Sequence, residues 1–177
     1  MDTNPESALI EFLRFNNWAN RQLFQACLSL TDEQLHQPIP GAYGTIRETL
    51  EHILRAEAGY LRLLTGSRPE APFRWDDPPS LATMASYAGE VEEALASAFA
   101  GVPPGQMVEA ELDGKPGRFQ ALALFIQLID HGIEHRTNIT TFLNQTLQLS
   151  LPIDGWTYLL AQPAHFGLEN VSRGSSR

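Results

Sequence analysis

The sequence predicts an all-α protein, a four-helix bundle with a short extra helix near the C-terminus. Three observations favour this class. Apolar residues recur at helical spacing over several long stretches, capping-box patterns mark helix starts, and strand-like alternation of polarity is confined to residues 108–112. Long helices joined by short turns and one extended connection are typical of a helix bundle.

Length, charge and composition limit the classes of protein that remain. The chain has 177 residues, 43% of them hydrophobic, which suits a single domain; we place it at residues 1–171 and expect a disordered tail at 172–177. A formal net charge of −9 without a Lys/Arg cluster argues against nucleic-acid binding. The sequence has neither a signal-like start nor an apolar run of about 18 residues. We therefore expect a soluble, cytoplasmic protein with no membrane contact.

The first helix is expected from about Pro5 to Leu28. Its inward stripe is apolar except for two amides, Asn16 and Asn20. Amides in such a position need hydrogen-bond partners or water inside the bundle. Cys27, the only cysteine, lies on the same stripe, so we expect a small core residue rather than a disulfide.

The second long helix is expected from Ile46 to about Leu64, with Gly66 as its stop. Two capping-box patterns mark helix starts in this region, Thr31 with Gln34 and Thr45 with Glu48. The first opens only a short turn, and the second opens the long helix. Residues 67–79 are rich in prolines and acidic residues, and this composition indicates a long connection rather than an element.

A third helix begins after Ser80, which is a suitable N-cap, and ends between Gly101 and Gly105. The alternation over 108–112, followed by Asp113-Gly114, indicates a small hairpin before the fourth long helix. A short last helix is expected after Asp154, over residues 156–161.

The candidate site is centred on the fourth helix, expected from Phe119 to about Asn144. His131 and His135 lie four residues apart on this helix and so share one face. If His52 of the second long helix faces the same point, three imidazoles and an open position match a catalytic divalent-metal centre. Burying such a pair without a metal would cost about 1–3 kcal/mol for each unsatisfied ring nitrogen. Gly132 would leave space beside the pair.

Glu57 occupies an inward position between apolar residues, where a carboxylate needs a partner. Two interpretations stay open. The first is catalytic: the carboxylate orients a ligand histidine or acts as a general base toward water at the metal. The second is structural, a salt bridge between helices, for instance to Arg136.

The five residues from His131 to His135 also match the H-x-x-E-H pattern of inverted zinc peptidases, in which the glutamate activates water. Those enzymes take a downstream carboxylate as third ligand, and here only Asp154 and Glu169 follow as acids. Because Glu134 belongs to the polar face of its helix, a peptidase is the weaker interpretation.

Four short segments, in matching order, resemble the DinB/YfiT-like superfamily. They are Asn17-Trp18-Ala19-Asn20, Thr49-Leu50-Glu51-His52-Ile53, Leu64-Thr65-Gly66 and His131-x-x-x-His135-Arg136. The resemblance spans about residues 8–145 and implies an up-down-down-up bundle in which His52, His131 and His135 hold nickel, zinc or another divalent ion. After the last histidine the chain reads Arg-Thr-Asn, a departure from the Arg-Gly-Gln that is frequent in this superfamily.

The resemblance further implies a divalent-metal-dependent enzyme that acts on a small molecule, often as a homodimer. The expected activity is a thiol-dependent S-transferase with a low-molecular-weight thiol as cosubstrate, or a hydrolase. Asn16, Asn20 and Tyr43 are candidates for orienting the substrate, and Glu57 for a catalytic role. One alternative is a non-catalytic metal-binding stress-response module, and another is a helical interaction protein whose histidines only pack.

Overall fold

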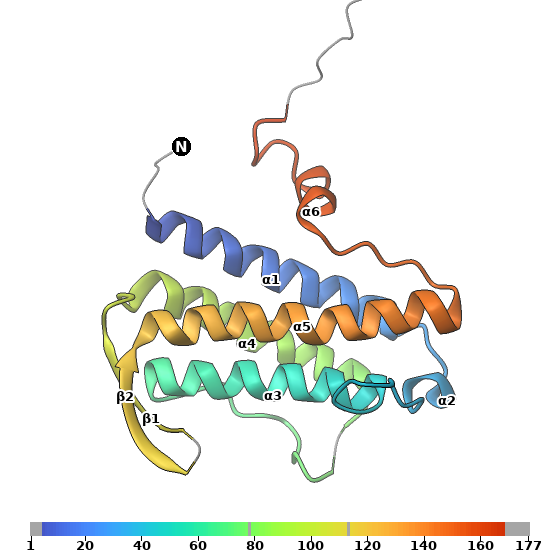
Figure 1. Cartoon of the computed structure of the whole chain (residues 1–177), viewed down its shortest axis with the longest axis horizontal. Helices are drawn as coiled ribbons and strands as arrows, with labels where there is room; N and C mark the ends of the chain where they lie inside the picture. The colour runs from blue at the N-terminus through green and yellow to red at the C-terminus, as the bar shows by residue number, and fades with distance from the viewer. Residues whose placement is uncertain (1–4, 78, 113, 169–177) are drawn as a thin grey trace, which may run out of the picture.

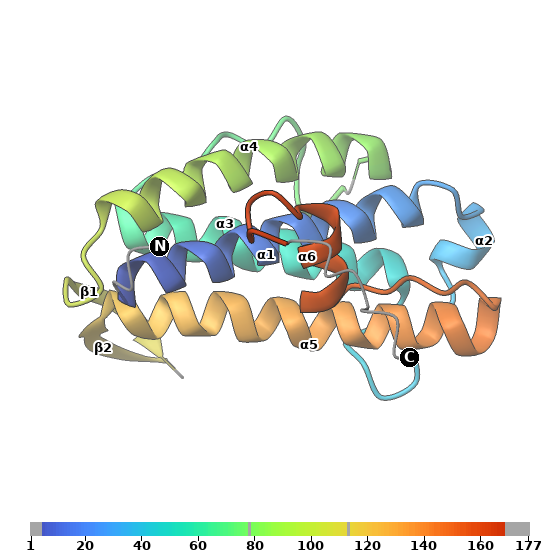
Figure 2. The same cartoon turned by 90° about the horizontal axis from the view of Figure 1, so that it is seen from above.

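Four long helices lie side by side in this computed structural model, which describes residues 5–77, 79–112 and 114–168 (Figure 1). They are α1 (Pro5–Cys27), α3 (Ile46–Thr65), α4 (Leu81–Gly101) and α5 (Ala121–Leu147). Helices α1 and α3 each pack against both α4 and α5. Both views show α1 and α5 running in one direction and α3 and α4 in the other (Figures 1 and 2). The mostly helical class predicted from the sequence is confirmed.

The hairpin expected before the fourth long helix is present. Strands β1 (Met107–Leu112) and β2 (Lys115–Gln120) pair antiparallel, with Met107 opposite Gln120. Of the predicted turn, Gly114 has the left-handed φ of 73° that glycine tolerates, and Asp113 lies outside the described residues. The prediction that α5 starts at Phe119 is wrong, because residues 119–120 pair with 107–108 and the helix begins at Ala121.

Helix starts follow the predicted caps. Both capping boxes form, at Thr45 before α3 and at Thr31 before the short α2 (Asp32–Leu35). Gly66 ends α3 with a φ of 81°. Side chains also cap the remaining predicted starts, Ser80 at α4 and Asp154 at α6 (Gly155–Ala161). These caps fix the residue at which each helix begins, and with it the register of the side chains along the helix.

The core lies between the four long helices and is apolar, with leucine and aromatic side chains from each of them and isoleucines from α3 and α5. Cys27 is fully buried in it, as predicted, and burial raises the pKa of its thiol to about 12. The connection between α3 and α4 is held to the core by aromatic packing, since Phe73 and Trp75 both contact Tyr87 of α4. No helix in the described part of the chain is long and apolar enough to cross a membrane.

Helix α6 lies against α1, where a second, smaller apolar cluster forms around Trp18 and Tyr158 (Figure 2). Glu11 of α1 fixes this contact, because its carboxylate accepts hydrogen bonds from the Tyr158 hydroxyl and from His165 Nε2, each 2.9 Å long. The predicted disordered tail, residues 172–177, lies outside the described residues.

Candidate metal centre

Three histidines converge between α3 and α5. The Nε2 atoms of His52 and His131 are 3.0 Å apart, and one ring nitrogen from each of the three residues lies within 4.8 Å of the others. The ring centroid of His135 lies 4.7 Å from that of His52 and 4.4 Å from that of His131. His131 and His135 are buried, and His52 is half-buried at the outer side of the cluster. His52 therefore does face the pair, as the sequence analysis required for a common site.

The spacing of the rings suits a divalent cation. Two nitrogens bound to one ion at about 2.0–2.1 Å lie about 2.8–3.4 Å apart for angles between octahedral and tetrahedral. The measured 3.0 Å between His52 and His131 falls in this range. The three-histidine cluster is thus compatible with metal binding.

The electrostatics favour neutral rings, which are the form that binds metal. Burial, with smaller contributions from His135 and His52, lowers the pKa of His131 to about 4. Burial and then the neighbouring His135 also lower the pKa of His52. Both rings therefore keep a free lone pair at neutral pH.

Two ring nitrogens at the site lack a partner among the described residues. The Nδ1 atoms of His131 and His135 are enclosed and make no hydrogen bond. Most metal-binding histidines donate this second N–H to a carboxylate or a carbonyl. The predicted orienting role of Glu57 is therefore wrong for these two rings, because neither Nδ1 atom reaches an acceptor.

Two tyrosines frame the histidines. The ring of Tyr43 stacks on His52 at a centroid distance of 3.8 Å and an interplanar angle of 15°, and 59% of this residue is exposed. Tyr60 meets His131 edge-on at 6.0 Å. Tyr60 was not among the predicted site residues, although its position two turns after His52 on α3 is a signal that it can reach the site. Tyr43 was a predicted substrate-binding residue, and the structure places it at the site.

A buried polar network lies beside the histidines and ties α1, α3 and α5 together. Asn16 and Asn20 each donate a 2.8 Å hydrogen bond to Oε1 of Glu57, and each accepts a 2.7 Å hydrogen bond from Nη1 of Arg136. All four side chains are buried. The inward asparagines predicted to need partners have found them, and their amides are engaged with Glu57 and Arg136.

Burial dominates the charges of this network. It raises the pKa of Glu57, although the hydrogen bonds from the two amides and the charge of Arg136 oppose the shift. It lowers the pKa of Arg136 to about 10, with Glu57 opposing. The amides join the two charged groups, so the salt bridge considered for Glu57 exists only in this indirect form.

Gly132 serves this network and does not leave empty space beside the metal centre. A Cβ atom at this position would lie 2.5 Å from Oδ1 of Asn16 and 2.6 Å from Nη1 of Arg136. The prediction that Gly132 leaves room beside His131 is therefore wrong. By contrast, a Cβ atom at Gly59 of α3 would meet no atom within 4 Å.

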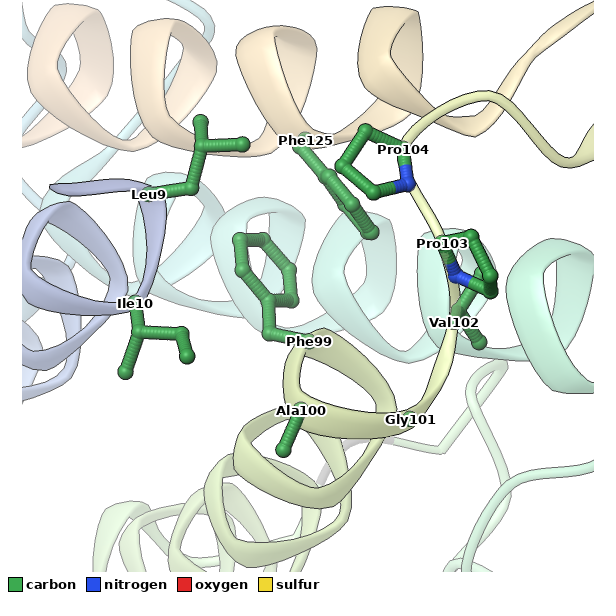
Figure 3. A pocket seen from close by; sticks show the side chains of 9 residues that line it. All are labelled: Leu9, Ile10, Phe99, Ala100, Gly101, Val102, Pro103, Pro104 and Phe125. Carbon is green, nitrogen blue, oxygen red and sulfur yellow. The ribbon is translucent and has the colours of Figure 1, made fainter. Parts of the chain in front are cut away.

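A separate cavity of about 200 Å³ lies at the end of α4 (Figure 3). Leu9, Phe99 and Phe125 project into it from α1, α4 and α5, and Pro103 and Pro104 border it. The side chains around it are all apolar, so it has no group for acid–base chemistry or metal binding.

Comparisons with known proteins identify relatives of the chain. The DinB family model matches residues 1–165. Protein DinB of Bacillus subtilis (strain 168) is 27% identical over 161 residues, a match that covers 82% of this chain and 90% of that protein. The range matched by the family model contains all three histidines and the whole polar network.

Proposed function

Because the chain belongs to the DinB family and brings three imidazoles together between α3 and α5, we propose that it is a divalent-metal-dependent enzyme acting on a small molecule. The observation that carries the proposal is the 3.0 Å approach of His52 to His131, with His135 in the same cluster. These three residues are the proposed ligands, and nickel and zinc both suit imidazole donors. The directions and contacts of the four long helices support the up-down-down-up four-helix bundle as its fold.

The chemistry we propose is thiol-dependent S-transfer or hydrolysis. When bound, a divalent ion lowers the pKa of a water or a thiol in its open position and so supplies a nucleophile near neutral pH. Tyr43 restrains the His52 ring by stacking and presents an exposed aromatic surface at the rim, where a small electrophile can pack. The low pKa of His131 keeps that ring unprotonated and able to bind the ion.

The polar network positions the ligands in this proposal. Arg136 follows His135 directly and is held to α1 through Asn16 and Asn20. Glu57 holds the same two amides from α3. The network therefore fixes α5 against α3, and with it the distance between the imidazoles, so we assign Glu57, Asn16 and Asn20 positioning roles. The structure gives no support to the peptidase interpretation, because Glu134 is exposed on the polar face of α5.

Metal analysis tests the ligand set. We expect about one divalent ion per chain in the purified protein and a loss of metal in each of His52→Ala, His131→Ala and His135→Ala. His165→Ala is the matched control, since that histidine contacts Glu11 beside α6 and should leave the metal content unchanged. A His135→Ala protein that is folded by circular dichroism and keeps the full metal content would refute the proposed ligand set.

Turnover separates an enzyme from a non-catalytic metal-binding stress-response module. Metal-loaded protein is assayed with low-molecular-weight thiols, such as cysteine and glutathione, against a halogenated aromatic electrophile, and with activated esters for hydrolysis. Metal-dependent turnover that His131→Ala abolishes supports the enzyme. Full metal content with no turnover in any of these assays would favour the module.

We also propose that the protein is a homodimer. Three large apolar side chains on α1 and α6 support this, since Phe12, Trp156 and Leu160 are 56%, 77% and 68% exposed. Burying such groups between two copies would be favourable. Sedimentation velocity should give a dimer that Phe12→Lys weakens, and a wild-type monomer at high concentration would refute it.

A further inference from the structure

A second cavity, of about 230 Å³, opens between α1 and α4 and ends at Glu57. None of the three histidines lines it. Glu57 and His52 are both on α3 but five residues apart, which is about 140° around the helix. Glu57 therefore faces α1 while His52 faces α5, and the two sites lie on different sides of α3.

One carboxylate oxygen of Glu57 is free for a ligand. Oε1 accepts both amide hydrogen bonds, and no described residue donates one to Oε2. The enclosed side-chain atoms without a partner in the described part of the chain are His131 Nδ1, His135 Nδ1 and Arg136 Nη2. Oε2 is absent from this set, so it is accessible although Glu57 as a whole is only 4% exposed. Because Glu57 is a lining residue of the cavity, we infer that the accessible surface of this oxygen opens into it.

The shape of the cavity suits a small ligand with an apolar body. Phe24 of α1 and Leu28, just after the end of α1, form one wall, and the small residues Ala85, Ala88 and Gly89 on α4 leave the space opposite. A cavity of about 150 Å³ is large enough for a benzene ring. The volume here therefore holds a ring together with a short polar head.

The charge of the cavity favours a cation. Two carboxylates, Glu57 and Glu92, and one guanidinium, Arg21, line it. The guanidinium of Arg136 reaches Glu57 only through the two amides and is not among the lining residues. Arg21 is already ion-paired with Glu92. Glu57, at the inner end, therefore has no ion-pair partner in the lining. Its Oε1 accepts the two amide hydrogen bonds, and its Oε2 remains accessible. A buried carboxylate in this state binds best to a charged hydrogen-bond donor.

We propose that this cavity is a second binding site, for a small organic cation whose ammonium or amidinium head donates to Oε2 of Glu57. Its apolar body lies between Phe24 of α1 and the small residues of α4. The site contains none of the three histidines, although Glu57 and Asn20 of the polar network line it.

Three probes with the same ring and different heads test the proposal: benzylammonium, benzyl alcohol and phenylacetate. Calorimetry on the full chain should show that benzylammonium binds at least about tenfold more tightly than the alcohol, since a hydrogen bond to a charged group is lost with the alcohol. Phenylacetate should not bind. In amide NMR spectra, benzylammonium should shift resonances of α1 and α4. No saturable binding of the amine, or equal binding of the alcohol, would overturn the site.

Variants separate this cavity from the metal centre. Gly89→Leu should lower amine affinity by about tenfold or more, because a Cβ atom there meets no atom within 4 Å and the side chain can fill the cavity. Gly59→Leu is the matched exchange on α3 and should leave the affinity unchanged. Glu57→Gln should bring the affinity for the amine down to that for the alcohol. If that variant fails to fold, Gly89→Leu still decides the question.

An amine can also bind a metal ion through its nitrogen, so His131→Ala is needed as well. Amine binding that persists in His131→Ala supports the cavity, whether or not the metal proposal holds. Amine binding that disappears in His131→Ala, or that survives in Gly89→Leu, overturns the proposal.

Discussion

Replacing Gly132 by alanine should destabilise the protein, although alanine is the better helix former. The added Cβ atom would lie 2.5 Å from Asn16 Oδ1 and 2.6 Å from Arg136 Nη1. Both atoms are ends of side chains, but both side chains are buried and hydrogen-bonded to each other at 2.7 Å. They can move away from the methyl group only by giving up these bonds.

The magnitude follows from the bonds at risk. Arg136 Nη1 donates to Asn16 and to Asn20, and a hydrogen bond to a charged group contributes about 1.5–3 kcal/mol. Losing both costs about 3–6 kcal/mol, from which the helix preference of alanine recovers about 1 kcal/mol. We expect Gly132→Ala to lower the free energy of unfolding by about 2–5 kcal/mol.

Urea denaturation followed by circular dichroism measures this change. Gly59→Ala is the control, because it is the same exchange inside a long helix at a position where the Cβ atom meets no atom within 4 Å. It should raise the free energy of unfolding by about 0.5–1 kcal/mol. A Gly132→Ala protein as stable as the wild type would refute the close packing of the network around this position.

Three further predictions concern metal, pH and the single thiol. For a protein held at free metal a hundredfold above its Kd, removing the metal with a chelator should lower the free energy of unfolding by about 2.7 kcal/mol. The chelator should not change the stability of His135→Ala. Calorimetry that shows the same loss of stability in the wild type and in His135→Ala would contradict the ligand set. Burial raises the pKa of Glu11, but hydrogen bonds from His165, Tyr158 and Arg14 outweigh it and lower the pKa below its ordinary 4.5. The docking of α6 should therefore be fully stabilised above pH 4.5 and lost as the pH falls through the lower folded-state pKa, with hydrogen exchange of α6 as the measurement. Glu11→Gln should remove this acid dependence, and an unchanged dependence would contradict it. Cys27, with a pKa raised by burial to about 12, should react with a thiol reagent at pH 8 only after unfolding, and rapid labelling of the native protein would contradict its burial.

Signals that act within a few residues could be predicted from the sequence. The capping boxes at Thr31 and Thr45 form because threonine and the residue three positions later bond to each other's backbone, whatever surrounds them. Gly66 ends α3 because it accepts a left-handed backbone. Such features carry their own physical cause, so no tertiary contact is needed to place them.

The start of α5 is a feature that local sequence signals do not predict. Phe119 was expected to start the apolar helical pattern, yet Phe119 and Gln120 pair with Val108 and Met107 across the hairpin. Backbone pairing with residues of β1, earlier in the chain, decides their conformation. The pattern of side chains along α5 could not reveal that competition.

The histidine cluster was predictable only in part. The four-residue step from His131 to His135 fixes their shared face on α5. That His52 meets them depends on how α3 packs against α5, which its position in α3 does not determine. The resemblance to a known superfamily supplied this link, and the structure places the three rings together.

The polar network was misassigned for a reason that helix geometry makes clear. Each residue turns an α-helix by about 100°, so Gly132 and Arg136 lie one step round from His131 and His135. The first pair faces the amides of α1, and the histidines face His52 on α3. Gly132 was expected beside the metal centre because it is next to His131 in the sequence, although this rotation turns it toward α1. For Glu57 both a role at the metal centre and a salt bridge to Arg136 were left open.

The two faces of α5 share one backbone, which couples the network to the metal centre. Anything that rolls or shifts α5 to relieve a clash at Gly132 also moves the ring nitrogens of His131 and His135 relative to His52. A ligand geometry held to within tenths of an ångström tolerates little of this. Gly132→Ala should therefore weaken metal binding without touching a ligand, while Gly59→Ala should leave it intact. Equal metal affinity in both variants would contradict this coupling, because it would show that the clash at Gly132 moves only nearby side chains and leaves the backbone of α5 in place.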